Sequence, residues 1–447
     1  MAKNTHQFIC QECGATHGKW AGRCASCGAW NSLVEQLNVS KDPALASARG
    51  TKLTGTQVGV LAKKQRSVRL STHVSDVDSV LGGGFVAGSV NLIAGQPGIG
   101  KSTLLMQLAA ELSTDHSVLY VSGEESLEQV SMRAERITPK KQAVLLASST
   151  SSDDIAETIL AKEHQVVIVD SIQTVSCHAV TSAPGSISQI TNSTYLLTQA
   201  AKQSGTTLII VGHVTKEGSI AGPKLLEHLV DVVLNLEGDR YGGFKVLRAV
   251  KNRFGSTSEV GIFDMTEKGL LPVANPSAVL LAERQVADGS IVLAAMEGTR
   301  PILVEVQALV NRTSFGYPKR AASGFDLNRL NLLTAVLSRR TKLDLSEYDV
   351  YINIVGGIKI TEPAADLAVC MAIASAAKGL KLKDDAVVFG EVGLSGEVRH
   401  VPNIEQRLKE VKQLGFKAAI GPKADTKSPL LQSVSSLKEA LNEYLKS

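Results

Sequence analysis

Near residue 100 the chain reads Gly95-Gln96-Pro97-Gly98-Ile99-Gly100-Lys101-Ser102-Thr103. The stretch matches the pattern G-x-x-x-x-G-K-[ST], with an apolar run before it and a helical pattern after it. Glycines allow backbone N–H groups to turn inward around phosphate oxygens, and the start of the following helix adds its positive dipole. We therefore predict that these residues form an ATP-binding phosphate loop rather than an ordinary turn. In that loop Lys101 would contact the β- and γ-phosphates, and Ser102 would ligate Mg²⁺.

Short apolar runs alternate with helical patterns on both sides of this loop. The expected strands cover residues 90–94, 118–121, 166–169 and 207–211, and the helical patterns include residues 104–112 and 191–203. Strands that are apolar throughout are typical of parallel sheets covered by helices on both faces. The sequence thus predicts an α/β fold over residues 56–265, in which ligands bind at the carboxyl ends of strands.

Acidic residues follow two of these strands. Asp170 ends the run of residues 166–169, where a carboxylate can hold Mg²⁺. An Asp after a strand is also a common helix cap, and it is the upstream phosphate loop that favours the magnesium role. Glu124 and Glu125 follow residues 118–121, so either is a candidate for orienting the attacking water. We favour Glu124, and the alternative is that both are solvated acids in a first helical turn.

A histidine ends the fourth strand, in Val211-Gly212-His213-Val214-Thr215-Lys216. A polar residue at this place can sense the γ-phosphate and move a neighbouring loop. A single histidine is as often a structural hydrogen-bonding group, so both roles of His213 stay open.

Four of the six cysteines lie within the first 27 residues, at Cys10, Cys13, Cys24 and Cys27. Two C-x-x-C pairs separated by ten residues have the spacing that tetrahedral thiolate coordination of Zn²⁺ requires. A site with four protein thiolates is structural, because no position remains for a catalytic water. Cys177 is isolated, as is Cys370, and both are expected to be ordinary buried residues. The role of Trp20, Lys19 and Arg23 between the pairs stays open between partner contact and local packing.

The remaining chain divides by composition. Residues 1–35 hold the cysteine module and residues 36–55 are polar and small, as in a linker. Residues 270–447 mix alternating strands with helices, which predicts an α+β domain. Its expected strands are residues 278–281 and 302–306, and its expected helices are residues 327–339 and 364–377.

The bulk composition excludes some classes of protein. Net charge is only +4, so a nucleic-acid partner would have to be bound through local patches. The N-terminus has no apolar run, and no stretch of about 20 apolar residues is present to span a bilayer. The sequence therefore predicts a cytoplasmic protein without a membrane partner.

One more motif, Lys251-Asn252-Arg253-Phe254-Gly255, joins the cysteine module, the phosphate loop and the α+β region. Together they make essentially the whole chain resemble the bacterial RadA (Sms) family of DNA-repair proteins. The resemblance implies an N-terminal zinc ribbon, a RecA-like ATPase core and a C-terminal Lon-protease-like domain. It also implies a DNA-dependent ATPase that assembles as a homo-hexamer. Such an enzyme would drive branch migration of recombination intermediates on single-stranded and branched DNA, alongside the RecA recombinase.

The resemblance gives roles to two basic residues of this motif. In the family the motif is required for the motor activity, which places Lys251 and Arg253 among the expected catalytic residues. A cation here can reach the γ-phosphate held by a neighbouring subunit, as an arginine finger does. A basic turn on the surface is the alternative from composition alone.

The Lon-like domain is expected to be inactive as a protease. Lon-type catalysis uses a Ser activated by a Lys. By the resemblance, the Ser position falls on Ala364 and the Lys position on Glu405. Because both reactive groups are missing, the domain is expected to serve oligomerisation and DNA contact.

Basic residues interleaved with aromatic ones are the candidates for that DNA contact, because cations neutralise phosphates and aromatic rings stack on bases. The first group is Arg312, Phe315, Tyr317, Lys319 and Arg320, and a weaker group is Arg339, Arg340 and Lys342. A solvated charged face is the alternative for both groups.

Rival functions also fit parts of the sequence. An ATP-dependent protease is opposed by Ala364 and Glu405. A nucleotide-switched scaffold, in which the zinc module docks a partner, would need the same phosphate loop but no response to DNA. An autokinase built on the same core is a more remote possibility.

Overall fold

The computed structural model of the chain describes residues 6–11, 15–37, 68–138, 143–213, 225–238, 243–314, 316–382, 386–426 and 428–446. Its contacts form two compact units. The first holds residues 1–236, 249–256 and 267–269, and the second holds residues 237–248, 257–266 and 270–447. The predicted linker lies outside the described residues from position 38 onward, and the predicted domain bounds stay a prediction.

The N-terminal module is a small antiparallel sheet. Its strands run in the order β2 (Thr16–His17), β1 (His6–Cys10) and β3 (Leu33–Leu37). Cys10, Cys24 and Leu33 are buried together and form its core. Because this core is so small, metal binding is expected to supply much of the stability of the module.

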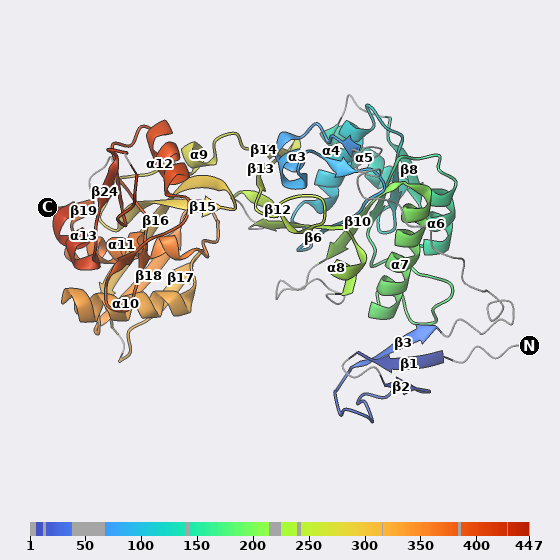
Figure 1. Cartoon of the computed structure of the whole chain (residues 1–447), viewed down its shortest axis with the longest axis horizontal. Helices are drawn as coiled ribbons and strands as arrows, with labels where there is room; N and C mark the ends of the chain where they lie inside the picture. The colour runs from blue at the N-terminus through green and yellow to red at the C-terminus, as the bar shows by residue number, and fades with distance from the viewer. Residues whose placement is uncertain are drawn as a thin grey trace, which may run out of the picture. The chain divides into compact units, whose positions relative to one another are not determined.

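A large, mainly parallel sheet contains the strands expected around the phosphate loop (Figure 1). Its order is β14 (Gly269–Pro272), β13 (Val260–Thr266), β12 (Lys245–Asn252), β11 (Val232–Gly238), β6 (Val90–Gly95), β10 (Thr207–His213), β9 (Val166–Asp170), β7 (Val118–Ser122) and β8 (Leu145–Ser148). Strands β11, β6, β10, β9, β7 and β8 pair in parallel, while β12 and β13 pair antiparallel. The predicted strands at residues 90–94, 118–121, 166–169 and 207–211 are confirmed.

Helices cover this sheet on both faces. They are α3 (Ser75–Leu81), α4 (Lys101–Leu112), α5 (Leu127–Ile137), α6 (Ser152–Leu160), α7 (Ile187–Ser204) and α8 (Leu225–Leu229). Alternate residues of β6, β7, β9 and β10 share one core with α6 and α7. The intervening residues of the same strands are equally buried, so the opposite face is covered as well. The uniformly apolar strands of the sequence follow from this double coverage.

The second unit has a mixed sheet in the order β17 (Arg320–Ser323), β18 (Tyr348–Ile354), β16 (Arg300–Arg312), β15 (Ser290–Glu297), β20 (Ala386–Val388), β23 (Ala418–Gly421) and β24 (Leu431–Ser433). Its longer helices are α10 (Leu327–Thr341), α11 (Asp366–Lys378), α12 (Ile404–Gln413) and α13 (Leu437–Tyr444). The short pairs β4 (Arg69–Leu70) with β5 (Phe85–Val86), β19 (Lys381–Leu382) with β25 (Leu445–Lys446), and β21 (Glu391–Val392) with β22 (Val398–Arg399) complete the strands of the chain's described part.

One predicted strand is wrong. Residues 278–281 belong to helix α9 (Pro276–Leu281) instead. The Asn275 side chain accepts a hydrogen bond from the Ala278 N–H, and Pro276 occupies the first turn, which are both helix-start signals. A run of four apolar residues is too short for its period to distinguish strand from helix. The predicted helices at residues 327–339 and 364–377 are confirmed, the second beginning as a 3₁₀ turn at Pro363–Ala365.

A buried charge organises the core of the second unit. The Arg407 side chain is fully buried and pairs with Glu362, with Nη2 to Oε2 at 2.5 Å. Its guanidinium also donates to the Ala294 carbonyl and lies 5.7 Å from the centre of the Phe389 ring. Arg407 thereby ties α12 to β15 and to the turn before α11.

Arg407→Met should remove this charge and leave the Glu362 carboxylate without its partner. Breaking a buried ion pair from one side costs about 3–5 kcal/mol of stability. We therefore expect a lower free energy of unfolding for the second unit, measured by urea denaturation followed by circular dichroism.

Arg312→Met is the matched control. Arg312 pairs with Glu347 at 3.0 Å, but their side chains are 77% and 67% exposed. An exposed pair contributes little, so the unfolding curve should be almost unchanged. Equal losses in the two variants would contradict a structural role for the buried charge.

Candidate active site and metal centre

The phosphate loop connects β6 to α4, as predicted. Gly98 and Gly100 have φ angles of 79° and 111°, which residues with side chains rarely adopt. A Cβ atom on Gly95 would lie 2.6 Å from the Leu236 carbonyl oxygen, so the chain needs glycine there. Ser102 and Thr103 follow in the first turn of α4. The loop of residues 95–103 therefore has the backbone conformation that its glycines predict.

Lys101 lies beneath the loop and is only 4% exposed. Its ammonium donates to the carbonyls of Gly95 at 2.9 Å and Gln96 at 3.0 Å. Burial lowers the pKa of Lys101 to about 8, although the nearby carboxylates of Asp170 and Glu124 act in the opposite direction. A cation held this way can leave the loop carbonyls for phosphate oxygens.

Parallel pairing brings the predicted acids to the same sheet edge as the loop. Asp170 ends β9 and is in register with Ser122, the last residue of β7. The Asp170 carboxylate is 8% exposed and accepts a hydrogen bond from the Tyr120 hydroxyl. His213 ends β10 in register with Gly95, so its backbone lies beside the loop.

The structure separates the two neighbouring glutamates. The Ser171 hydroxyl donates to Glu124, which places this carboxylate directly beside the end of β9. Glu125 instead pairs with Arg133 of α5 at 2.6 Å. Of the two acids, Glu124 is thus the one near Lys101 and Asp170.

The two predicted motif cations lie elsewhere in the first unit. Lys251 donates to the carbonyls of Glu227 at 2.5 Å and Val230 at 2.8 Å, which are at the end of α8. Burial, with Arg253 nearby, lowers the pKa of Lys251. Arg253 pairs with Asp231 at 3.3 Å, and its side chain is 56% exposed.

Asp231 fixes the position of Arg253 relative to the phosphate loop of the same chain. Its carboxylate accepts a hydrogen bond from the Val90 N–H at 2.9 Å, at the first residue of β6. Gly95 is five residues further along β6, which is roughly 17 Å at 3.3 Å per strand residue. Arg253 therefore lies at the opposite edge of the sheet from its own loop.

The cysteine module brings three of its predicted ligands together. The Sγ atoms of Cys10, Cys24 and Cys27 lie within 4.8 Å of one another, and those of Cys10 and Cys27 are 3.6 Å apart. A tetrahedral zinc site with bonds near 2.3 Å has sulfur atoms about 3.8 Å apart, so the donor set fits Zn²⁺. A backbone N–H of Cys27 lowers the pKa of Cys24 to about 5, which favours the thiolate. Cys13 lies outside the described residues.

Sequence reasoning missed several residues that contact these sites. His17 Nε2 lies 3.3 Å from the Cys24 sulfur, and Ser32 lies 3.3 Å from that of Cys10. In the ATPase domain the missed residues are Tyr120, which contacts Asp170, Arg133, which pairs with Glu125, and Asp231, which pairs with Arg253. No local motif marks any of them, because each acts through strand register or packing.

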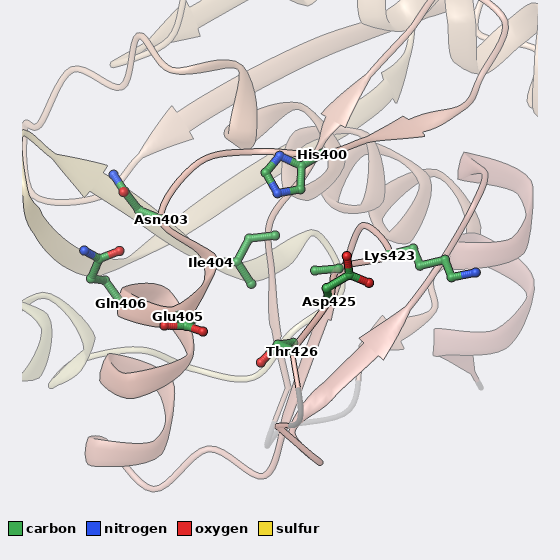
Figure 2. Close-up of a pocket in the computed structure, with 9 residues that line it drawn as sticks. His400, Asn403, Ile404, Glu405, Gln406, Lys423, Asp425 and Thr426 are labelled. Carbon is green, nitrogen blue, oxygen red and sulfur yellow. The ribbon is translucent and has the colours of Figure 1, made fainter.

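The two positions that the resemblance aligns with a protease dyad lie in different elements of the second unit. Ala364 is buried in the 3₁₀ turn, and Glu405 lies in the first turn of α12. Glu405 lines a pocket of about 600 Å³. Figure 2 shows it on the other side of this pocket from Lys423. The pocket is lined by His400, Asn403, Ile404, Glu405, Gln406, Lys423, Ala424, Asp425 and Thr426. Ala364 is not among these residues.

The predicted basic patches are partly occupied by structural contacts. Arg320 donates to the Leu345 carbonyl at 2.9 Å and to that of Tyr348, and burial lowers its pKa. Tyr317 is 88% exposed and available for stacking. Phe315 lies outside the described residues. In the second group, Arg340 donates to the Leu394 carbonyl at 3.1 Å, while Lys342 is the C-cap residue after α10.

Family models match three parts of the chain. Residues 8–35 match the rubredoxin metal binding domain, and residues 62–219 match the AAA domain. Residues 332–425 match subunit ChlI of Mg-chelatase. These matches support a zinc ribbon, an ATP-hydrolysing domain and a ChlI-like C-terminal domain, so the expected fold class is confirmed. Among the described residues, no helix has the length and apolarity needed to cross a membrane.

Curated relatives match nearly the whole chain, and each is named DNA repair protein RadA. The protein of Bacillus subtilis is 49% identical over 431 residues, covering 95% of this chain and 94% of the relative. That of Pseudomonas aeruginosa is 48% identical over 427 residues, covering 94% of each. That of Aquifex aeolicus is 44% identical over 430 residues, covering 95% of each. With the phosphate loop, the cysteine cluster and the ChlI-like domain in place, the chain belongs to the RadA family of DNA repair proteins.

Proposed function

We propose that this protein is a DNA-dependent ATPase motor that drives branch migration of recombination intermediates, working as a homo-hexamer with RecA. The observation that carries the proposal is the position of Arg253. Its half-exposed guanidinium lies at the sheet edge opposite its own phosphate loop, held by Asp231. A cation so placed can serve catalysis on the nucleotide of an adjacent subunit, and such a contact couples hydrolysis to subunit movement.

Within one subunit, the proposed division of labour follows the geometry. Lys101 exchanges the Gly95 and Gln96 carbonyls for the β- and γ-phosphates. Ser102 and Asp170 would hold Mg²⁺, which supplies charge neutralisation between the phosphates. Glu124 orients the attacking water, because it lies beside Asp170 while Glu125 is paired with Arg133.

The motif cations are proposed to act in trans. Arg253 would contact the γ-phosphate bound by the neighbour, and it leaves or stretches its Asp231 contact to do so. Lys251 caps the end of α8 and would hold the strand that carries Arg253. The sequence around them belongs to the same unit as the loop, so nucleotide state and motif position can be coupled within each subunit.

The C-terminal domain is proposed to be a scaffold without peptidase activity. A Ser–Lys dyad cannot form where Ala364 and Glu405 stand, since neither offers a nucleophile or an amine base. Arg312 and Tyr317 are the remaining exposed candidates for DNA contact in the first group. Single-stranded and branched DNA are the proposed substrates.

Mixing two inactive variants tests the trans contact. Lys101→Ala disables the loop but keeps Arg253, whereas Arg253→Ala keeps the loop and loses the cation. If the cation acts in trans, mixed rings contain sites with an intact loop and a neighbour's Arg253. A 1:1 mixture should then recover up to about a quarter of the wild-type DNA-stimulated ATPase rate, the chance of correct pairing at each arginine-finger site.

The same assay separates the motor from its rivals. Each variant alone should be nearly inactive, and single-stranded DNA should stimulate the wild type. A mixture no more active than its components would remove the trans role of Arg253. A wild-type rate that stays flat across a DNA titration would favour the nucleotide-switched scaffold.

The pKa of Lys101 predicts how ATP affinity depends on pH. Its pKa is about 8 without nucleotide, and phosphate binding raises it, so ATP binding above pH 8 must take up a proton. The Kd for a fluorescent ATP analogue should be nearly constant below pH 7.5 and rise about tenfold between pH 7 and pH 9. Lys101→Arg, which stays protonated, should show no such rise. A flat wild-type profile would contradict the buried, loop-bound lysine.

The zinc ribbon is proposed to be structural and to dock a partner. Cys27→Ser removes one of the clustered thiolates, so zinc measured by a colorimetric chelator should fall to a small fraction of the wild-type content. Nucleotide binding should be retained, because the phosphate loop lies in a separate sheet. Cys177→Ser is the control, since this buried cysteine is outside the cluster. Full zinc content in the Cys27 variant would refute the ligand assignment.

A further inference from the structure

A buried tyrosine contacts the acid at the end of β9. Tyr120 lies on β7, two residues before Ser122, which is in register with Asp170. Its side chain therefore shares a sheet face with Asp170, and its hydroxyl donates to Asp170 Oδ2. Within the described residues this leaves Oδ1 of the carboxylate for a metal ion or its water.

An arginine of α5 fixes the direction of that hydrogen bond. Arg133 Nη2 lies 3.4 Å from the Tyr120 hydroxyl oxygen, and its side chain is 14% exposed. A guanidinium can only donate, so the tyrosine must accept from Arg133 and give its single proton to Asp170.

The same arginine reaches the second acid of the glutamate pair. Arg133 Nη1 contacts Glu125 Oε2 at 2.6 Å, and Glu125 directly follows Glu124 in the chain. The Gly123 N–H between β7 and these acids donates to the Asp170 carbonyl at 2.8 Å. One side chain of α5 thus contacts both the partner of Asp170 and the neighbour of Glu124.

We propose that Tyr120 and Arg133 are positioning residues that orient the Asp170 carboxylate for Mg²⁺ and fix the loop that carries Glu124. The inference rests on the proposed magnesium role of Asp170 and extends it to α5. Groups that hydrogen-bond a metal-binding carboxylate set its orientation, and their loss typically weakens metal affinity about 10–100-fold.

The test measures nucleotide binding rather than turnover. The Kd of a fluorescent ADP analogue is determined in EDTA and across a Mg²⁺ titration for wild type and Tyr120→Phe. The Phe ring preserves packing but removes the hydrogen bond. We expect unchanged affinity in EDTA and a Mg²⁺ concentration for half-maximal tightening that rises about tenfold or more.

Three further variants make the assignment specific. Tyr195→Phe removes a hydroxyl that contacts Gln199 on the exposed side of α7, and its Mg²⁺ titration should match wild type. Arg133→Met should shift the titration like Tyr120→Phe. Arg133→Lys keeps the charge but has one nitrogen in place of the two that contact Tyr120 and Glu125, so it should fall between Arg133→Met and wild type.

Asp170→Asn separates the failure of this inference from that of the proposed function. If Asp170→Asn leaves the Mg²⁺ titration unchanged, Asp170 does not hold the ion. The magnesium role of Asp170 in the proposed function and the positioning role of Tyr120 and Arg133 are then both overturned. If Asp170→Asn shifts the titration but Tyr120→Phe and Arg133→Met match wild type, only the positioning role is overturned. A loss of affinity in EDTA for both variants would also overturn it, because it would indicate general damage to the site.

Discussion

Parallel pairing of fully buried strands is the constraint on which the active site depends. Strands β6, β10, β9 and β7 run in the same direction, so their carboxyl ends meet at one sheet edge. Register then brings Asp170 opposite Ser122 and His213 opposite Gly95, although these residues are far apart in the sequence. A slip of one residue would turn each side chain to the other face of the sheet. The apolar character of the strands therefore matters for chemistry as well as for stability.

The opposite edge of the same sheet carries a second charged cluster. Asp231 accepts from the Val90 N–H, pairs with Lys202 and contacts Arg253 at 3.3 Å. A carboxylate that is 4% exposed needs such partners, because an unpaired buried charge is costly. The two edges of one rigid sheet thus hold a nucleotide-binding loop and an exposed cation. In the proposed ring, that separation would let Arg253 of one subunit contact the nucleotide bound by the next subunit.

The C-terminal unit, which matches subunit ChlI of Mg-chelatase over residues 332–425, contains ion pairs in its interior. Arg407 pairs with Glu362, and Arg329 pairs with Asp366. Asp366 is fully buried at the start of α11, directly after the turn that contains Ala364. Burial raises the pKa of Asp366, and the Arg329 hydrogen bond opposes that rise. These ion pairs connect α12 and α10 to the beginning of α11, and they would hold the shape of the scaffold that we propose for this unit.

By itself, the sequence determined the phosphate loop, the buried strands around it, the cysteine module and the α+β character of the C-terminal unit. Those features have short-range signals: glycines at fixed spacing, uninterrupted apolar runs and paired thiols. Only the tertiary structure distinguished Glu124 from Glu125. It also decided the ion pair of Arg253 with Asp231 and the hydrogen bond of Tyr120 with Asp170. The helix at residues 276–281 depended instead on its cap, which outweighs a four-residue apolar run. The three contacts of the ATPase domain are made between elements and have no local pattern, whereas the helix signals at Asn275 and Pro276 are local.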